Sequence, residues 1–304
     1  MDRFEAMSML LTAVEKGSLS AAARHLRVPV PTLSRKVADL EATLGTQLLT
    51  RTTRKLTLTD TGIAYAAAAR RILEQVNEAE REAAGEFTTP RGDLVITAPL
   101  LFGRWHVLPI VADFLTEFPQ INVRLLLGDR VTDLIDDHID MAVRIGKLAD
   151  SGMIATRVGS MRAIVCASPK LLAAHGTPQT PEDLERLPCI SADGAMLAPN
   201  WHFRLPDPER TIEVPIMPRL LTQAEAAVEA AVRGLGFVRL RYYHAFDEIQ
   251  VGQLVVVLEA YEPELTPIHV VHVPRSQMPL KMRRFLDYAV PRLRKSLASI
   301  NSAD

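Results

Sequence analysis

The sequence predicts an α/β fold class, in which a small helical unit and a long helix precede a larger part where strands alternate with helices. Three observations point to this class. The chain has 304 residues, about twice the usual size of one domain. Apolar residues recur at helical spacing from the start of the chain. Beyond residue 90, short apolar runs alternate with amphipathic stretches, which is typical of mostly parallel sheets covered by helices.

The composition is that of a chain with real cores, because 48% of its residues are hydrophobic and 23% are charged. No stretch approaches the roughly 18 apolar residues that cross a bilayer. Asp2 and Glu5 lie where a signal peptide carries positive charge. Two cysteines, Cys166 and Cys189, form neither a disulfide framework nor a C-x-x-C pair, which fits a reducing compartment. We therefore expect a cytoplasmic protein without a membrane partner.

Two helices are predicted first. Residues 3–16 form one of them and Gly17 ends it. Ser18 or Ser20 can cap the short helix that follows, by accepting a hydrogen bond from its free N–H groups. The predicted inward side chains of the first helix are Phe4, Met7, Leu10, Leu11 and Val14.

A third helix and a hairpin complete this unit. Pro31 suits the first turn of the helix, which Gly45 ends. Leu56 and Leu58 alternate beside a basic tip, as in a two-stranded wing. The predicted inward stripe of the third helix is Leu33, Val37, Leu40 and Leu44. The side chains predicted to face outward are Thr32, Arg35, Lys36 and Asp39.

A basic patch is hidden in the net charge of -1. Residues 24–55 hold seven basic and two acidic side chains, a local excess of five positive charges. A helix pair with a basic outer face can place its second helix in the major groove of DNA. Any single one of these charges can equally be a solvated surface group. The predicted groove-facing residues are Thr32, Ser34, Arg35 and Lys36. The predicted phosphate contacts are Arg24, Arg51, Arg54 and Lys55.

A long helix is predicted over residues 60–86. Its apolar stripe is too narrow for a helix that stands alone, so a helix from a second copy of the chain is its natural cover. Residues 88–92 then read as a hinge. The stripe consists of Tyr65, Ala68 or Ala69, Ile72, Val76, Ala79 and Ala83.

The remaining part, about 210 residues, has room for two α/β lobes with a cleft between them. Thr222 and Glu225 match a capping box at the start of a helix. A late strand over 267–273 and a helix over 282–290 follow, and Pro291 is expected to break or kink that helix. The other apolar runs cover 94–98, 121–127, 139–145 and 162–167, and the amphipathic stretches cover 104–117, 169–174 and 223–233.

The segment AVEKGSLSAAARHLRVPVPTLSRKVADLEATLGTQLLTRTTRKLTLTDTG resembles the N-terminal signature of LysR-type transcriptional regulators. Later segments, such as GDLVITAPLLFGRWHVLPIVADFLTEFP and AAVRGLGFV, resemble the effector half of the same family. The resemblance covers nearly the whole chain. It implies a winged helix-turn-helix over 1–59, a linker and dimerisation helix with its hinge over 60–90, and an effector domain over 91–304. That domain is expected to be two-lobed and like periplasmic solute-binding proteins, with lobe I over about 91–161 and 268–304 and lobe II over about 162–267.

The resemblance also implies partners. These are double-stranded promoter DNA with an interrupted palindrome, a small-molecule effector, and further copies of the chain in a dimer and a dimer of dimers, a homotetramer. RNA polymerase is a further partner that transcription regulation implies. We expect no cofactor.

Two departures from the family pattern concern binding. Relatives often have Ser-Gln-Pro where this chain has Pro29, Val30 and Pro31, so base reading shifts to apolar contact by Val30 or to Thr32 and Arg35. Relatives also tend to have proline at Arg241 and asparagine near Thr222, which changes the implied pocket.

The implied effector site lies at strand ends that face the cleft. Leu100, Leu101 and Phe102 make it apolar, and Arg130 can pair with a carboxylate, so we expect a small organic acid. Arg130 can also be a solvent-facing arginine, Thr97 a plain strand residue, and Cys166 an inert core thiol. The full set of candidates is Thr97, Ala98, Pro99, Leu100, Leu101, Arg130, Ile145, Gly146, Cys166 and Thr222, with Asp129 beside Arg130.

Other classes of protein have less support. No catalytic motif follows a predicted strand, and the GLG at 234–236 precedes one, so we expect no enzyme and no catalytic residue. His269 and His272 point to opposite faces of a strand and make a poor metal pair. A solute-binding protein without a regulatory role and a ligand-independent architectural DNA-binding protein stay as alternatives.

Overall fold

The computed structural model describes residues 2–51, 56–83, 89–130, 132–148, 152–192, 200–205, 210–275 and 278–301. The chain divides into two compact units, Met1–Thr89 and Pro90–Asp304. Among the described helices, none has the length and apolarity needed to span a membrane.

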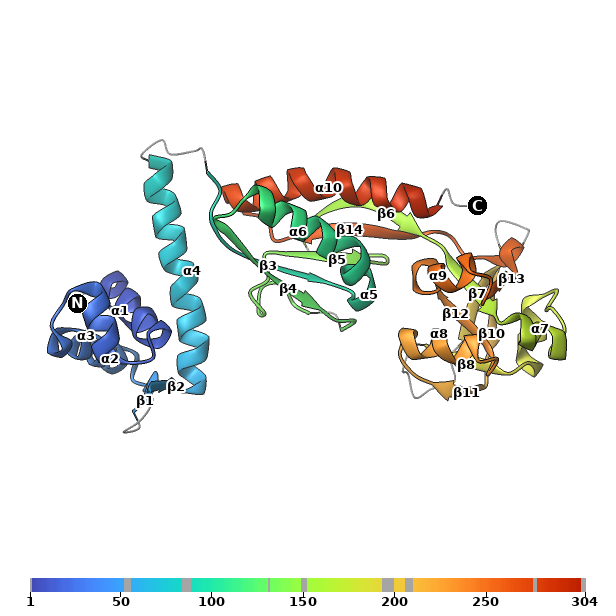
Figure 1. The fold of residues 1–304 in the computed structure, drawn as a ribbon, viewed down its shortest axis with the longest axis horizontal. Coiled ribbons are helices and arrows are strands. Elements are labelled where there is room, and N and C mark those ends of the chain that lie inside the picture. Colours follow the sequence, from blue (N-terminus) through green and yellow to red (C-terminus); the bar gives the residue numbers. More distant parts are fainter. Residues whose placement is uncertain are drawn as a thin grey trace. The chain divides into compact units, whose positions relative to one another are not determined.

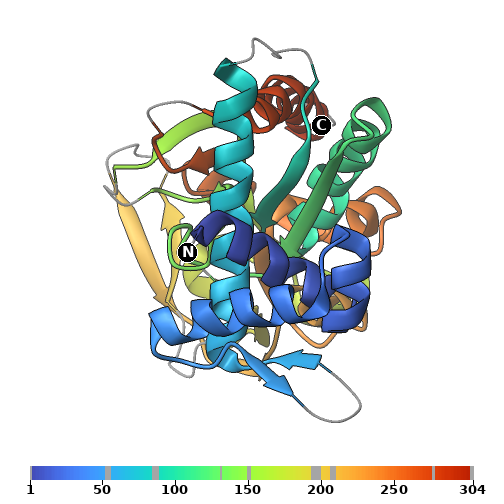
Figure 2. The same cartoon turned by 90° about the vertical axis from the view of Figure 1, so that its left-hand side faces the viewer.

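The first unit contains the expected three helices, hairpin and long helix. Three short helices pack together around a core that includes Leu10, Leu33 and Leu40. They gather beside the N-terminal half of the long helix α4, whose C-terminal half continues past them (Figure 1, Figure 2). The elements are α1 (Arg3–Glu15), α2 (Leu19–Leu26), α3 (Val30–Leu44), β1 (Leu49–Arg51), β2 (Leu56–Leu58) and α4 (Asp60–Ala83).

Side chains fix where these helices begin. Asp2 accepts a hydrogen bond from the backbone N–H of Phe4 at 2.9 Å. Of the two candidate serines before α2, Ser18 forms the cap and accepts from the Ala21 N–H at 3.1 Å. Thr59 caps α4 through the N–H of Gly62, whose missing side chain lets the helix approach the carbonyl of Leu48.

Two residues of the predicted inward stripes are exposed instead. Phe4 is 49% exposed, because the buried face of α1 is set by Ala6, Met9, Leu10 and Ala13. Leu44 is 41% exposed, because it is the last residue of α3, where the chain turns away at Gly45 with a positive φ. The predictions for Phe4 and Leu44 were therefore wrong, whereas Leu33, Val37 and Leu40 are buried as expected.

The second unit begins with a five-stranded mixed sheet in the order β4-β3-β5-β14-β6. Strand β3 runs parallel to β4 and β5, and β14 runs antiparallel to β5 and β6. Helices α6 and α10 cover one face of this sheet, with Phe114 and Phe285 in the core between them (Figure 1). The elements are β3 (Gly92–Ala98), α6 (Leu108–Glu117), β4 (Ile121–Leu127), β5 (Met141–Ile145), β6 (Ile154–Met161), β14 (Thr266–His272) and α10 (Leu280–Asn301).

A second five-stranded mixed sheet has the order β11-β8-β12-β7-β13. Helix α8 packs on one face through Ala227 and Val228. Leu171 of α7 and Trp201 of the β9–β10 hairpin pack on the other face. The elements are β7 (Ala163–Ala167), α7 (Pro169–His175), β8 (Cys189–Ser191), β9 (Asn200–Arg204), β10 (Thr211–Pro215), β11 (Pro218–Leu221), α8 (Ala224–Val232), β12 (Phe237–Arg241) and β13 (Val255–Val257).

Short helices fill the connections of the second unit. The first three residues of the helix after β3 are α-helical, and the next turn is a π-helix that continues into α6. The short elements are α5 (Leu100–Phe102), η1 (Gly103–Val107), η2 (Pro181–Arg186), η3 (Tyr242–His244), α9 (Phe246–Gln250) and η4 (Glu259–Tyr261).

Three expectations for this unit need correction. The sheets are mixed rather than mostly parallel, because β14 inserts antiparallel between β5 and β6 in the first sheet and β7 runs antiparallel to β12 and β13 in the second. The expected break at Pro291 does not occur, because α10 runs from Leu280 to Asn301 with Pro291 inside it; Pro291 is exposed, and buried Ala289 and Leu293 on either side of it anchor the helix in the core. Thr222 does not form a capping box, because α8 begins after Gln223, whose side chain makes no capping hydrogen bond.

Candidate nucleic-acid interface and effector site

Helices α2 and α3 form the candidate DNA-binding pair. Ala22 and Ala23 of α2 are buried against the core that Leu33 of α3 shares. Arg27 turns the chain between the helices with a left-handed φ of 56°. The N–H of Val28 donates to the carbonyl of Ala23 at 3.0 Å and closes the turn.

The predicted groove-facing residues differ in how far they are exposed. Val30 is 40% exposed at the first turn of α3, and Pro31 and Arg35 are exposed as well. Thr32 and Ser34 are half-buried. The Nζ of Lys36 pairs with Oε2 of Glu5 on α1 at 2.5 Å, so this side chain is partly turned back onto its own unit.

The predicted phosphate contacts are only partly described. Arg24 is exposed on α2. Arg51 ends β1, but its side chain, like the whole of Arg54 and Lys55, lies outside the described residues.

Glu41 is a positioning residue that the sequence reasoning did not single out. Its carboxylate accepts from the backbone N–H groups of Leu48 at 2.8 Å and Leu49 at 3.0 Å. This contact ties α3 to the first strand of the wing. Its only sequence signal is the Leu-Glu-x-x-Leu-Gly element, in which the acid precedes the turn at Gly45.

The effector candidates of the first sheet cluster where β3 ends and α5 begins. Thr97, Ala98 and Leu101 are buried, and Pro99 and Leu100 are half-buried. The N–H of Leu100 donates to Oδ1 of Asp129 at 3.1 Å. The carboxylate of Asp129 therefore already accepts from one of the N–H groups that a helix leaves without a partner at its start.

The other candidates of the same sheet lie near this cluster or in solvent. Arg130 is exposed next to Asp129. Ile145 packs into the core at the end of β5. Gly146 follows it with a φ of +130° and donates its N–H to the carbonyl of Pro267 at 2.9 Å.

Cys166 and Thr222 belong to the second sheet: Cys166 lies in β7 and Thr222 directly follows β11. Cys166 has no exposed surface in β7, and burial raises the pKa of its thiol to about 12, which agrees with an inert core residue. It packs in one core cluster of the sheet and Cys189 in the cluster on the other face, which excludes a disulfide between them. Thr222 is half-buried and donates its N–H to the carbonyl of Ser191 at 3.0 Å.

An aromatic contact joins the two lobes at this place, and the sequence reasoning missed it. Tyr243 of η3 is 2% exposed. Its ring meets that of Phe102 edge to face at 5.6 Å and those of Trp105 and His106 at 6.3 Å. The π-helical turn brings these three side chains together, and Gly103 allows it to lie against Leu127. No local sequence pattern predicts which distant ring will meet them.

Two histidines at this contact are held neutral by their surroundings. Burial lowers the pKa of His106 from 6.5 to about 4, and its Nδ1 lies 3.0 Å from Oγ of Ser296. Burial, followed by the charge of Arg241, lowers the pKa of His244 from 6.5 to about 3. Both imidazoles are therefore uncharged at pH 7.

An ion pair ties together the two chain segments that cross between the lobes. Arg162 follows β6, and Glu262 precedes β14. The Nε of Arg162 lies 2.9 Å from Oε2 of Glu262 and its Nη2 lies 2.8 Å from Oε1, so the pair is bidentate. The same guanidinium lies 5.3 Å from the ring centre of Tyr242.

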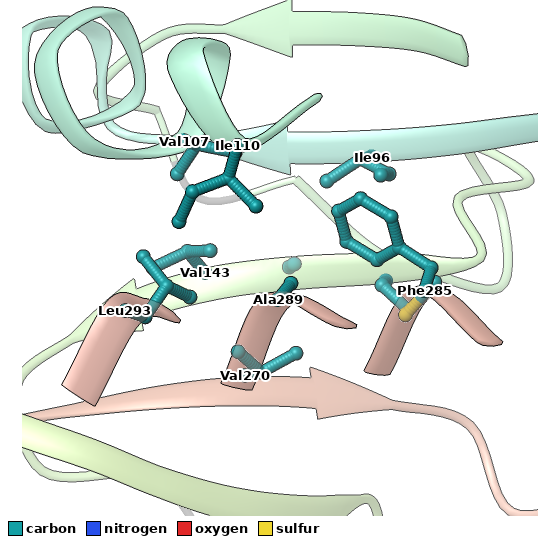
Figure 3. Close-up of a pocket in the computed structure, with 10 residues that line it drawn as sticks. Ile96, Val107, Ile110, Val143, Val270, Phe285, Ala289 and Leu293 are labelled. Atoms are coloured by element: carbon teal, nitrogen blue, oxygen red, sulfur yellow. The ribbon is translucent and has the colours of Figure 1, made fainter. Parts of the chain in front are cut away.

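A small cavity lies inside the first lobe, away from the effector candidates. Its lining is wholly apolar and includes Ile96, Val107 and Phe285 (Figure 3). None of the ten effector candidates lines it. It has room for about one water molecule and no polar group to hold one, so it belongs to the core beneath α10.

The described residues contain no group of three or more His, Cys, Asp or Glu side chains that could hold a metal ion. His272 is buried and its Nδ1 lies 3.1 Å from the carbonyl oxygen of Val273, while His269 is half-buried.

Comparison with known proteins gives matches along nearly the whole chain. Residues 4–63 match the model of the bacterial regulatory helix-turn-helix protein, lysR family, and residues 88–294 match the LysR substrate binding domain. An HTH-type transcriptional repressor of Pseudomonas aeruginosa is 31% identical over 95% of this chain and 92% of its own length. The HTH-type transcriptional activator AaeR of Escherichia coli is 30% identical over 93% of this chain and 91% of its own length.

Solved structures agree with these matches. CrgA, a LysR-type transcriptional regulator from Neisseria meningitidis, is 32% identical, with a TM-score of 0.58 over 95% of this chain and 98% of that chain. The Vibrio cholerae virulence activator AphB is 24% identical and shares the fold, with a TM-score of 0.60 over 94% of this chain and 98% of that chain. Neither the architectural nor the solute-binding alternative receives support from these matches.

Proposed function

Since this chain belongs to the LysR family of DNA-binding transcriptional regulators, we propose that α3 reads the major groove and that the effector is a small, largely apolar organic acid. The observation that carries the first part is the exposed start of α3, where Val30, Pro31 and Arg35 face outward while Leu33 and Val37 are buried in the core shared with α2. Two such helices in a homodimer would meet successive major grooves about 34 Å apart on an interrupted palindrome.

We propose the following contacts for DNA. Val30 and Pro31 offer apolar contact to a thymine methyl group, and Arg35 offers hydrogen bonds to a guanine edge. Thr32, Ser34 and Lys36 line the same face, with Lys36 reaching DNA only when it leaves Glu5. Arg24 and the wing residues Arg51, Arg54 and Lys55 contact phosphates.

A mobility-shift titration against the upstream region of the protein's own gene tests this assignment, with random duplex as reference. Arg35→Ala is expected to weaken specific binding by about 1 to 3 kcal/mol and to leave binding to random duplex almost unchanged. Lys36→Ala is the matched control and is expected to have a smaller effect, because its charge is already paired with Glu5. If Arg35→Ala prefers the specific fragment over random duplex as strongly as the unaltered chain does, Arg35 does not read bases and the proposed groove-facing side of α3 is wrong.

The proposed effector site is the end of β3 with its neighbours from β4 and β5. It comprises Thr97 to Leu101, Arg130, Ile145 and Gly146, with Thr222 across the cleft. Cys166 is a buried core residue and is not proposed to contact the effector. Leu100 and Leu101 supply apolar contact and Arg130 a carboxylate partner. Asp129 holds the Leu100 N–H, so an acid that binds there has to displace it.

Titration calorimetry with aromatic and aliphatic monocarboxylates, against a polyhydroxylated sugar, tests the effector class. Asp129→Asn removes the competing charge and is expected to tighten carboxylate binding, whereas Arg130→Gln is expected to weaken it. Tight binding of the sugar alone, or weaker carboxylate binding in Asp129→Asn, contradicts the proposal.

The remaining features of the proposal concern assembly and place. The protein acts in the cytoplasm as a dimer joined through α4, with two dimers forming a tetramer that can bend the DNA between its sites. Effector binding shifts the balance between two assembly shapes through its different affinity for each. RNA polymerase is the partner whose activity at the promoter changes with the assembly shape. The protein itself catalyses no reaction and needs no cofactor.

A further inference from the structure

Three basic side chains form a row across the first sheet of the second unit. His269 of β14 pairs with Arg144 of β5 on one side and with Arg157 of β6 on the other. Directly paired residues of antiparallel strands point to the same face. Because neighbouring strands lie about 4.8 Å apart, the Cα atoms of the two arginines are roughly 10 Å apart. The three strands are adjacent in Figure 1.

The row lies on the face of the sheet that α6 and α10 do not cover. Val143 and Val270, the neighbours of Arg144 and His269, point the other way into the core beneath those helices. On the row's own face, a small cluster around Leu134 covers the sheet next to Ala142. Arg157 is exposed, and Arg144 and His269 are half-buried.

No carboxylate of the described residues balances these charges. The Nη2 of Arg144 donates to the carbonyl and hydroxyl oxygens of Thr132, at 2.5 and 3.2 Å. The Nδ1 of His269 is buried and has no hydrogen-bond partner. Burial and the charge of Arg157 lower the pKa of His269, and no carboxylate of the described residues raises it.

Asp140, which directly precedes β5, and Asp133, which follows Thr132, have other partners. Asp140 accepts from Arg275 at 3.0 Å and from the N–H of Val95 at 3.0 Å. Asp133 accepts from the N–H groups of Ile135 and Asp136, which lowers the pKa of its carboxyl group.

We propose that Arg144, His269 and Arg157 bind a phosphoryl dianion, either free phosphate or a phosphate monoester. Two guanidinium groups supply two positive charges and forked donors, which match the charge and the oxygen geometry of a phosphoryl group. The imidazole between them adds a donor. A monocarboxylate would leave one arginine unbalanced, and the three-strand row is too short to follow a nucleic-acid backbone. None of the three residues belongs to the proposed effector set or to α3, and Arg144 directly precedes Ile145 of that set.

Titration calorimetry of the full chain with inorganic phosphate, at constant ionic strength and pH 7.5, tests the site. Arg157→Gln is the informative variant because the Arg157 side chain is exposed and makes no hydrogen bond or ion pair with the described residues, and it is expected to weaken phosphate binding by about tenfold or more. Arg124→Gln is the matched control: it is exposed on β4, on the same face of the same sheet but outside the row, and is expected to change affinity by less than about twofold. His269→Gln is expected to fall between them.

Methyl phosphate and acetate distinguish the sources. Binding of methyl phosphate at least as tight as that of inorganic phosphate identifies a monoester as the ligand, and preference for inorganic phosphate identifies the free ion. Acetate that binds as tightly as phosphate overturns the proposal, as does undiminished phosphate binding in Arg157→Gln or an absence of phosphate binding to the unaltered chain. The phosphate titration contains no DNA, so a failure of the proposed DNA contacts would not change its outcome.

Discussion

Both cysteine side chains are buried on opposite faces of one sheet, which determines their chemistry. Burial raises the pKa of each thiol to about 12, so almost no thiolate is present at pH 8. We expect neither Cys166 nor Cys189 to react with a thiol reagent in the native protein, and both to react after unfolding in guanidinium. A rapid thiol count in native buffer measures this, and one fast-reacting group there would contradict the burial.

Protonation of two histidines is expected to lower the stability of the chain in acid. The pKa values of His106 and His244 are about 4 and about 3 in the folded chain, against 6.5 as the ordinary value. The unfolded chain therefore binds protons first as the pH falls below 6.5, and the stability that the neutral histidines contribute is lost between pH 6.5 and about 4 for His106 and between pH 6.5 and about 3 for His244. We expect Tm to fall over this range.

His106→Gln separates this effect from other titrations. The variant keeps a polar group near Ser296 but cannot be protonated, so the fall in Tm between pH 7 and pH 5 should be smaller than in the unaltered chain. An equal fall in both proteins would assign the acid sensitivity to other groups.

At the scale of the element, the long helix α4 has more apolar surface than its own unit covers. Ala66 and Ala69 are buried, whereas Ile72, farther along the helix, is 37% exposed. Ile72→Asp is expected to convert a dimer into a monomer, because a charge at a helix–helix contact loses its hydration. Sedimentation velocity measures the change.

Arg70→Asp is the control for this prediction. Arg70 is exposed on the polar side of the same helix, so the same new side chain there should leave the dimer intact. If both variants stay dimeric, the dimer forms through another surface, and the proposal that the apolar side of α4 joins the two copies is wrong.

Elements with a local cause were predictable from the sequence, whereas those with a distant cause were not. The end of α1 shortly before Gly17 and the Ser18 cap depend on residues within one turn. The position of β14 between β5 and β6 depends on strands more than a hundred residues away, so alternation alone predicted parallel sheets and was wrong. The Thr222 capping box failed because the chain at Thr222 is held by the carbonyl of Ser191.

The candidate sites divide in the same way. The outward position of Arg35 on α3 could be predicted from the sequence, because helical spacing decides which side chains face outward. The pairing of Lys36 with Glu5, the hold of Asp129 on Leu100 and the packing of Tyr243 against Phe102 join residues from separate elements. Only the tertiary structure brings these groups together.

At the scale of the whole molecule, the ion pair between the two crossing segments is a test of how firmly the lobes are joined. The side chains of Arg162 and Glu262 are 16% and 15% exposed. Glu262→Gln removes the negative charge of the bidentate partner of Arg162, so we expect a loss of about 1 to 3 kcal/mol in the free energy of unfolding by urea. Glu259, 64% exposed and 3.4 Å from the same arginine, is the control, and Glu259→Gln should cost less than about 0.5 kcal/mol. Equal losses would mean that the bidentate geometry adds nothing.

The late arrival of β14 also orders events on the ribosome. The first unit ends at Thr89, so its core can close while most of the polypeptide is still being translated. The first sheet of the second unit cannot close until Thr266–His272 has emerged, and until then β5 and β6 lack their shared neighbour. Nascent chains that end between these strands and residue 266 therefore expose unpaired strand edges, and we expect these intermediates to be the ones that chaperones hold.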